Sequence, residues 1–133
     1  MQYKNQGCPI RFAAGVLGDR WSLVIIRDLM FKNRKYYGDF LTAGEGISTN
    51  ILANRLIRLE TEDVIKKSLD PEHGKRYIYT LTKKGKALLP VLLSMMEWAS
   101  VYDEATEMPK GFVKKLRNDR QSLSLEILAN LQS

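Results

Sequence analysis

Residues Tyr36 to Glu62, with the sequence YYGDFLTAGEGISTNILANRLIRLETE, decide the fold of this 133-residue chain. A short helical pattern over 36–43 turns its large apolar side chains to one side. Gly44-Glu45-Gly46 predicts a tight turn, because two glycines flank one polar residue. Ser48 then suits the N-cap of a second helix over 49–62, since its hydroxyl can accept a hydrogen bond from an unpaired backbone N–H. The stretch therefore predicts two helices joined by a tight turn.

The second of these helices has a polar outer face that points to nucleic acid. Leucines at helical spacing line one side, and polar residues one turn apart line the other. Asparagine suits the edge of adenine and arginine that of guanine, whereas hydroxyls and helix N-termini suit phosphate. The expected base-facing residues are Asn50, Asn54 and Arg58 with Thr49 beside them, and the expected phosphate-facing residues are Ser48 and Arg55. The alternative is an ordinary solvated helix face.

A β-hairpin is expected directly after this helix. Its strands are predicted over 64–69 and 76–81, and the loop between them has the proline and glycine of a hairpin turn. Helices, tight turn, helix and hairpin follow one another in the order of a winged helix-turn-helix. The expected contacts to the DNA backbone are Lys75 and Arg76 at the hairpin tip and Lys35 in the basic loop before the motif. Alternatively, these cations only solvate the surface.

Helical patterns flank the motif on both sides. They predict helices over Pro9–Leu17, over Arg20–Phe31 after an Asp19 cap, over 82–102 with a kink at Pro90, and over 112–131. The fold class is therefore mainly α with a small β-hairpin, a winged helix-turn-helix with C-terminal dimerisation helices. We expect residues 1–103 to form the DNA-binding domain, including the start of the dimerisation helices, and residues 104–133 to form a helical extension.

The helix expected over 82–102 carries more apolar surface than a domain of this size can cover alone. A second copy of the chain is the expected partner, which makes the protein a homodimer. The expected interface residues are Leu88, Leu92, Met96, Trp98, Leu116 and Leu128. Alternatively, Trp98 lines a cavity for a small-molecule effector.

The amino-acid composition favours a nucleic-acid-binding protein and gives no support to several other classes of protein. A net charge of +6 and a pI near 9.5 favour a phosphate-bearing partner such as double-stranded DNA. One cysteine and one histidine provide neither an intramolecular disulfide nor a zinc site, and no catalytic pair is visible, so we expect no metal, no cofactor and no enzyme. The most apolar stretch, 87–102, falls short of the about 20 residues that span a bilayer. We therefore expect a cytoplasmic protein without a membrane partner.

Several spaced motifs in one order resemble a known family. They are Cys8-Pro9, Gly18-Asp19-Arg20-Trp21, Gly46-Ile47-Ser48, Leu52, Arg55-Leu56, Leu59-Glu60 and Tyr79-Thr80-Leu81-Thr82-Lys83-Lys84-Gly85. Over residues 8–102 the chain resembles the HxlR-type bacterial transcriptional regulators. The resemblance implies a homodimeric winged-helix DNA-binding protein that represses or activates nearby genes.

Two positions depart from the pattern of that family. Asp63 stands where the family usually has glycine, which predicts a left-handed backbone conformation for this aspartate. Asp19-Arg20 stands where the family more often has Gly-Lys, so one positive charge is kept. Neither change removes the expectation of DNA binding.

The resemblance also implies a role for Cys8, because some relatives use a cysteine at this Cys-Pro position as a thiol sensor. A sensor thiol must be accessible and easily deprotonated, and the N-terminus of a helix next to Arg11 favours both properties. The alternative is a buried cysteine that packs as a small apolar residue. For the chain as a whole, the alternative function is a winged-helix module that binds protein, or that binds DNA without sequence preference.

Overall fold

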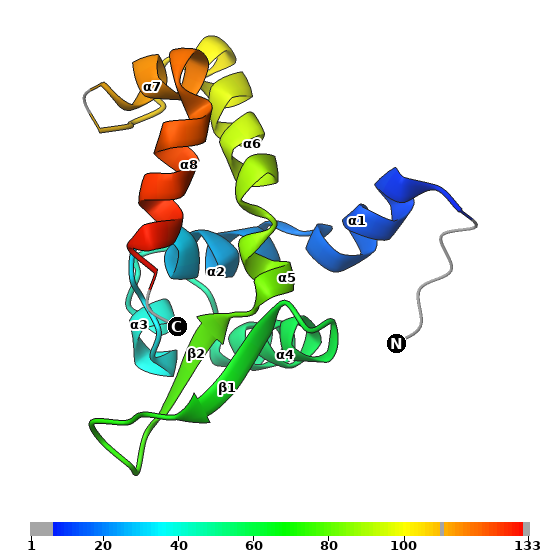
Figure 1. Cartoon of the computed structure of the whole chain (residues 1–133). Helices are drawn as coiled ribbons and strands as arrows, with labels where there is room; N and C mark the ends of the chain where they lie inside the picture. Colours follow the sequence, from blue (N-terminus) through cyan, green and yellow to red (C-terminus); the bar gives the residue numbers. More distant parts are fainter. Residues whose placement is uncertain (1–6, 110, 132–133) are drawn as a thin grey trace. The chain divides into compact units, whose positions relative to one another are not determined.

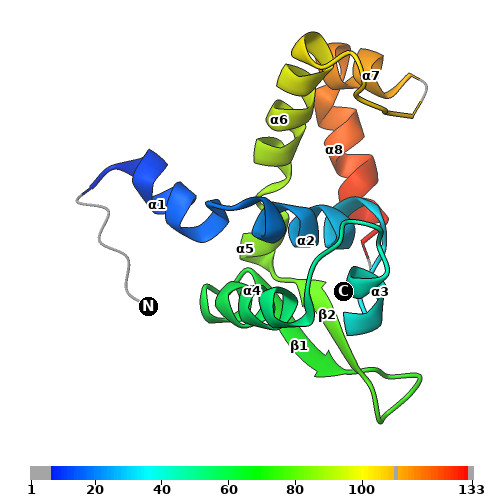
Figure 2. The ribbon, with the colours of Figure 1, turned by 180° about the vertical axis from the view of Figure 1, so that it is seen from behind.

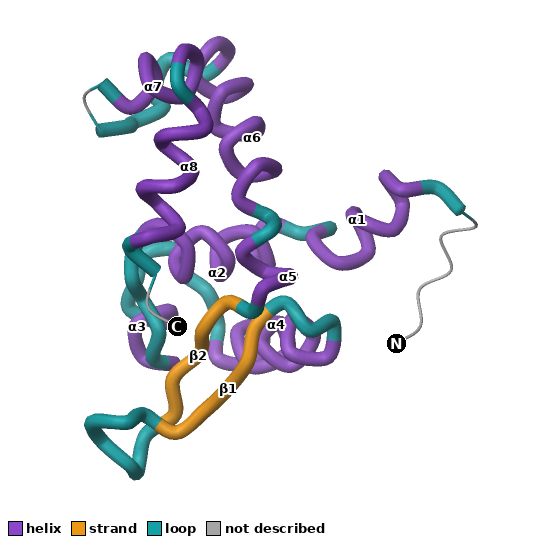
Figure 3. The backbone as a smooth tube through the Cα atoms, in the orientation of Figure 1, coloured by secondary structure: helices purple, strands orange, loops and turns teal. Residues whose placement is uncertain are grey.

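The computed structural model describes residues 7–109 and 111–131 (Figure 1). Its elements are α1 (Pro9–Leu17), α2 (Arg20–Phe31), α3 (Tyr37–Leu41), α4 (Thr49–Thr61), β1 (Ile65–Leu69), β2 (Tyr77–Leu81), α5 (Lys83–Lys86), α6 (Leu89–Tyr102), α7 (Phe112–Asn118) and α8 (Arg120–Ala129). The packing divides the chain into two compact units, residues 1–85 and residues 86–133. The predicted fold class is confirmed, since a mainly helical chain carries one small hairpin (Figure 3).

Two helices of the first unit, α2 and α4, begin at the side-chain caps that the sequence predicts. Asp19 accepts a hydrogen bond from the backbone N–H of Ser22 at 2.9 Å and starts α2. Ser48 accepts one from the backbone N–H of Ile51 at 3.2 Å and starts α4. Such caps pair backbone groups that the helix leaves without partners.

The core of the first unit lies where α2 and α4 pack together and β1 lies alongside α4 (Figures 1 and 2). Apolar residues of all three elements are almost fully buried there, as expected for the inward stripes of amphipathic helices. They include Ile25 and Ile26 of α2, Leu52, Leu56 and Leu59 of α4, and Ile65 of β1. Because the leucines face inward, the opposite face of α4 is left exposed.

The hairpin is antiparallel and joins α4 through a left-handed residue. Its register pairs Ile65 with Leu81 and Leu69 with Tyr77. Asp63, between α4 and β1, has φ = 60°, so the left-handed conformation predicted for it is confirmed. Gly85 lies against this junction: a Cβ on it would stand 2.1 Å from the carbonyl oxygen of Val64, so only glycine fits.

In two places the sequence prediction of a single helix was wrong. The helix predicted over 82–102 is divided into α5 and α6, and Pro90 lies in the first turn of α6. Proline is tolerated there because the N–H it lacks has no helical partner, so Pro90 starts a helix and does not kink one. The helix predicted over 112–131 is divided at Asp119, whose φ of −150° and ψ of 55° are not helical.

In the second unit, α6, α7 and α8 pack around buried leucines, and polar contacts tie α8 to α6. The Arg120 guanidinium donates to the Glu97 carboxylate at 2.8 Å and to the Ser94 hydroxyl at 3.1 Å. The buried leucines are Leu89, Leu93, Leu116 and Leu123. The division of the chain into residues 1–103 and 104–133 stays a prediction.

Within the described residues, none of the helices combines the length and the hydropathy that crossing a membrane requires.

Candidate nucleic-acid interface

The solvent-facing side of α4 presents most of the residues expected to contact DNA. Thr49, Asn50 and Asn54 are exposed. The hydroxyl of Ser48 is exposed as well, but it is engaged as the cap of the helix. The Tyr37 hydroxyl donates to the carbonyl oxygen of Thr49 at 3.3 Å and so fastens the first turn of α4 to α3. The start of α4 is therefore both open to a ligand and fixed in place.

Arg55 and Arg58, also on α4, converge on the carboxylate of Asp19. The Arg55 Nε lies 2.8 Å from Asp19 Oδ2, and the Arg58 Nη1 lies 3.4 Å from the same oxygen. Arg55 also donates from Nη1 to the Asn54 Oδ1 at 2.7 Å. Partial burial alone would raise the pKa of Asp19, but hydrogen bonds from Ser22 and Arg55 hold this pKa below its ordinary value. Asp19 is thus an anion that neutralises part of the charge of α4.

Ile57 is a residue of this face that the sequence analysis missed. It lies between Asn54 and Arg58 on α4, and its side chain is 63% exposed. An exposed isoleucine amid polar residues suits the methyl group of thymine, because apolar contact is how proteins recognise that group. Its position, two turns after Asn50 and one turn after Ala53, was visible in the sequence, but only the structure shows that its side chain is exposed.

The hairpin tip is joined to the start of α3 by a buried carboxylate. Asp70, at the end of β1, is 3% exposed and accepts a hydrogen bond from the Tyr36 hydroxyl at 2.5 Å. The Arg76 guanidinium lies 3.9 Å from the centre of the Tyr36 ring and 3.9 Å from Asp70 Oδ2. The hydrogen bonds from Tyr36 and from the backbone N–H of Glu72 lower the pKa of Asp70, and the Tyr36–Asp70 bond raises the pKa of Tyr36.

The three cations expected to contact phosphate from the hairpin and from the loop before α3 therefore differ in how exposed their side chains are and in what they contact. Arg76 is half-exposed and stacks on Tyr36, whereas Lys75 is exposed at the tip beside His73. Lys35 is partly buried, and its backbone carbonyl accepts from the N–H of Tyr79 in β2 at 2.8 Å. Near Lys35, the side chain of Arg34 is bound to the buried Asp28 at 2.8 Å. Of the three expected cations, Lys75 is thus the one most open to a phosphate group.

Cys8 is the N-cap residue of α1 and is partly buried. Its carbonyl oxygen accepts from the N–H of Phe12 at 3.0 Å, as in a regular first turn. In residues 7–109 and 111–131, no three His, Cys, Asp or Glu side chains gather closely enough to hold a metal ion.

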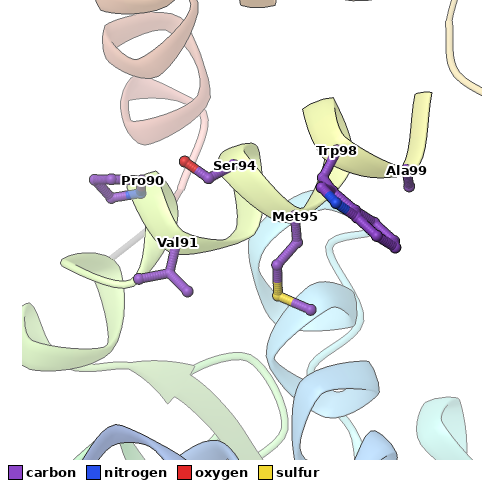
Figure 4. Close-up of a pocket in the computed structure, with 6 residues that line it drawn as sticks. All are labelled: Pro90, Val91, Ser94, Met95, Trp98 and Ala99. Carbon is purple, nitrogen blue, oxygen red and sulfur yellow. The ribbon is translucent and has the colours of Figure 1, made fainter. Parts of the chain in front are cut away.

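Part of the expected dimer interface lies exposed on α6, and Figure 4 shows Trp98 from this set. Leu92 and Leu116 are buried in the single chain, and Leu88, Met96 and Leu128 are partly exposed. Trp98 is 67% exposed, and its ring lies 5.3 Å from that of Tyr102. A shallow apolar hollow runs along this side of α6 and is lined by Pro90, Val91, Ser94, Met95, Trp98 and Ala99. We refer to these six residues as the α6 face.

Residues 16–107 match the family model of the HxlR-like helix-turn-helix. The chain belongs to this family. An HTH-type transcriptional regulator of Synechocystis is 38% identical over 93 residues, which cover 70% of this chain and 68% of that protein. The HTH-type transcriptional regulator YodB of Bacillus subtilis is 37% identical over 101 residues, which cover 75% of this chain and 89% of YodB.

Solved structures agree with this membership. The reduced form of YodB from B. subtilis matches with a TM-score of 0.61 and 33% identity, over 75% of this chain and 98% of that one. The oxidised form of the redox regulator HypR matches with a TM-score of 0.62 and 25% identity, over 71% and 96% of the two chains. This HxlR-like protein is therefore a transcriptional regulator of the winged helix-turn-helix type.

Proposed function

We propose that this HxlR-like regulator binds double-stranded DNA sequence-specifically, as a homodimer on an inverted repeat. The observation that carries the proposal is the exposed face of α4, which turns Asn50 and Asn54 outward while its leucines are buried. A helix of this kind fits the major groove, where asparagine distinguishes adenine by its hydrogen-bonding edge. When it is bound to DNA, the protein controls the transcription of neighbouring genes, by repression or by activation.

The other residues predicted to bind DNA are assigned to phosphate contacts or to base contacts. Lys75 and Arg76 at the hairpin, Lys35 before α3 and Ser48 before α4 contact phosphates of the DNA backbone. Arg55 contacts a phosphate through the N–H groups that Asp19 and Asn54 leave free. Thr49 lies beside the base-reading residues. Arg58 reads a base only when it leaves the Asp19 carboxylate, which it meets at 3.4 Å.

The α6 face supports the homodimer. Large apolar side chains such as Val91, Met95 and Trp98 lie exposed along one helix. Removing such a surface from water lowers the free energy, which favours association. A second copy of the same helix supplies the complementary apolar surface in a two-fold dimer. Two recognition helices related by that axis meet half-sites about 34 Å apart, one turn of DNA.

Oxidation of Cys8 regulates this DNA binding. Solved structures of YodB include a reduced form, a quinone-bound form and a diamide-treated form, and HypR is named a redox regulator. In this chain Cys8 is partly accessible at the start of α1. Because there is one cysteine, oxidation that removes two electrons and two protons joins its sulfur to a second chain or to a small thiol.

Selection from random duplex DNA tests the proposal. The reduced protein at near-physiological salt is expected to enrich an inverted repeat. A pool without any motif, with only weak and salt-sensitive binding, would contradict sequence-specific recognition. That outcome would favour the alternative of a winged-helix module that binds protein or binds DNA indiscriminately, because phosphate contacts alone carry no sequence information.

A further inference from the structure

Asp19 lies outside the DNA-binding set described above, yet it is the anchor of a short chain of polar contacts that ends on α4. One of its carboxylate oxygens caps α2 by accepting from the N–H of Ser22 at 2.9 Å. The other oxygen accepts from the Nε of Arg55 at 2.8 Å. The cap fixes the carboxylate to the start of α2, and the carboxylate in turn fixes the guanidinium, which is only 21% exposed.

The same guanidinium determines which way the amide of Asn54 faces. Arg55 donates from Nη1 to the Asn54 Oδ1 at 2.7 Å. Arginine has five N–H donors and no acceptor, so the atom of the amide that faces it must be the oxygen. The amino group of Asn54 is consequently the free end of the side chain. We call this series of contacts, from Asp19 through Arg55 to Asn54, the Asp19 relay.

We propose that Asp19 is a positioning residue for DNA recognition, which acts through Arg55 to present the amino group of Asn54 to the base edge. This inference rests on the proposed function, because it assigns a base preference to a helix that reads DNA. Asp19 itself contacts no base.

The relay has a consequence for the base that Asn54 meets. Pairing of asparagine with adenine uses the amide oxygen and the amino group together, on N6 and N7. With its oxygen turned to Arg55, Asn54 offers donors alone, and guanine presents two acceptors, N7 and O6, in the major groove. The structure thus assigns guanine to the position opposite Asn54, whereas an unanchored asparagine there would prefer adenine.

The test compares selection pools of the wild type with those of Asp19→Ser and Arg55→Lys. Serine keeps the cap of α2 but is too short to hold Arg55. Lysine keeps the positive charge of Arg55 but lacks the fork that reaches two acceptors. In both variants the same position of each half-site is expected to shift from guanine toward adenine by about tenfold, the discrimination of one good base contact. Asp19→Ser also frees Arg58, which meets Asp19 at 3.4 Å, so a second position that changes in Asp19→Ser alone is assigned to Arg58.

Asp103→Ser is the matched control. It removes the same charge and a comparable hydrogen bond, from the N–H of Ala105 at 3.1 Å, in the other unit of the chain. The DNA sequences that Asp103→Ser selects are expected to contain the same motif as those that the wild type selects. If Asp19→Ser fails to fold by circular dichroism, Arg55→Lys alone decides the outcome.

A measurement without DNA separates this inference from the proposed function. The side-chain amide of Asn54 and the Nε–H of Arg55 give separate NMR signals, and both are expected to shift in Asp19→Ser but not in Asp103→Ser. Identical base preferences in the wild type and both variants, or an equal loss on all sequences, would overturn the positioning role and leave the proposed function standing. A wild-type pool without a motif overturns the proposed function, and the positioning role falls with it.

Discussion

The hydroxyl of Tyr36 donates to the buried carboxylate of Asp70 at 2.5 Å, across 34 positions of the chain. Tyr36 precedes α3, and Asp70 follows the first strand of the hairpin. The contact therefore fixes the hairpin to the helix-turn-helix at the end where the basic loop lies. Arg76 covers the Tyr36 ring from the hairpin side.

Tyr36→Phe is expected to lower the free energy of unfolding, because it leaves a nearly buried carboxylate with one hydrogen-bond donor fewer. The pKa of Asp70 is lowered from 3.8, so the stabilisation is present above that value and is lost as the pH falls through the lowered pKa. The pKa of Tyr36 is raised from 10.0, so the stabilisation is present below that value and is lost as the pH rises through the raised pKa.

Urea unfolding of the wild type and Tyr36→Phe between pH 3 and pH 11 measures this difference. It is expected to be constant near neutrality and to shrink at both ends of the range. Tyr37→Phe is the matched control, since the Tyr37 hydroxyl makes an exposed contact of 3.3 Å. A difference as large for Tyr37→Phe as for Tyr36→Phe would contradict the role given to the buried contact.

Asn50→Ala and Lys75→Ala are expected to weaken DNA binding in different ways. Loss of Asn50 changes base preference in the selected motif, because an amide reads a base edge. Loss of Lys75 weakens binding to all sequences alike and reduces the slope of log affinity against log salt by about one. Lys114→Ala, an exposed lysine of α7, is expected to change neither property. Uniform loss in Asn50→Ala, measured by fluorescence anisotropy on cognate and random DNA, would argue against base reading.

Trp98→Glu is expected to convert the dimer to a monomer, because a carboxylate buried in an apolar interface is costly unless it is paired. Light scattering at micromolar concentration is expected to give twice 15.3 kDa for the wild type and 15.3 kDa for the variant. Leu69→Glu, at an exposed apolar residue of the hairpin, is expected to remain dimeric. A monomeric wild type would refute the homodimer.

Cys8→Ser is expected to bind the selected DNA as the reduced wild type does, and to lose the response to oxidation. Diamide is expected to weaken or redirect binding of the wild type, in a way that a reducing thiol reverses. Titration of both proteins into labelled DNA, before and after diamide, measures the effect. An equal response of the two proteins would exclude Cys8 as the sensor.

The sequence predicted the local features of the fold well. The bounds of α1 and α2, the cap at Ser48 and the left-handed Asp63 are confirmed by the structure. Each depends on neighbouring residues: a cap, a proline or a position that needs positive φ. The same local patterns did not show that Pro90 starts a helix or that Asp119 divides one, because apolar periodicity continues across both breaks.

The sequence patterns did not predict contacts between segments that are far apart in the chain. Asp19 was recognised as a cap, but its contact with Arg55, 36 positions away, depends on how α2 packs against α4. Arg76 was expected to face phosphate, and its stacking on Tyr36 follows from the folding of the hairpin onto the start of α3. The exposed Ile57 was visible as an apolar residue, but only the structure shows that it is not part of the core.

In the proposed complex, the two recognition helices of one dimer meet two half-sites on the same side of the DNA. The most direct test of this arrangement is the affinity for the selected inverted repeat after five or ten base pairs are inserted between the half-sites. Five base pairs turn one half-site by about half a helical turn, and ten restore its direction at a greater distance. Insertion of five base pairs is expected to reduce the affinity to that for a single half-site. Affinity that is unchanged by this insertion would contradict the account.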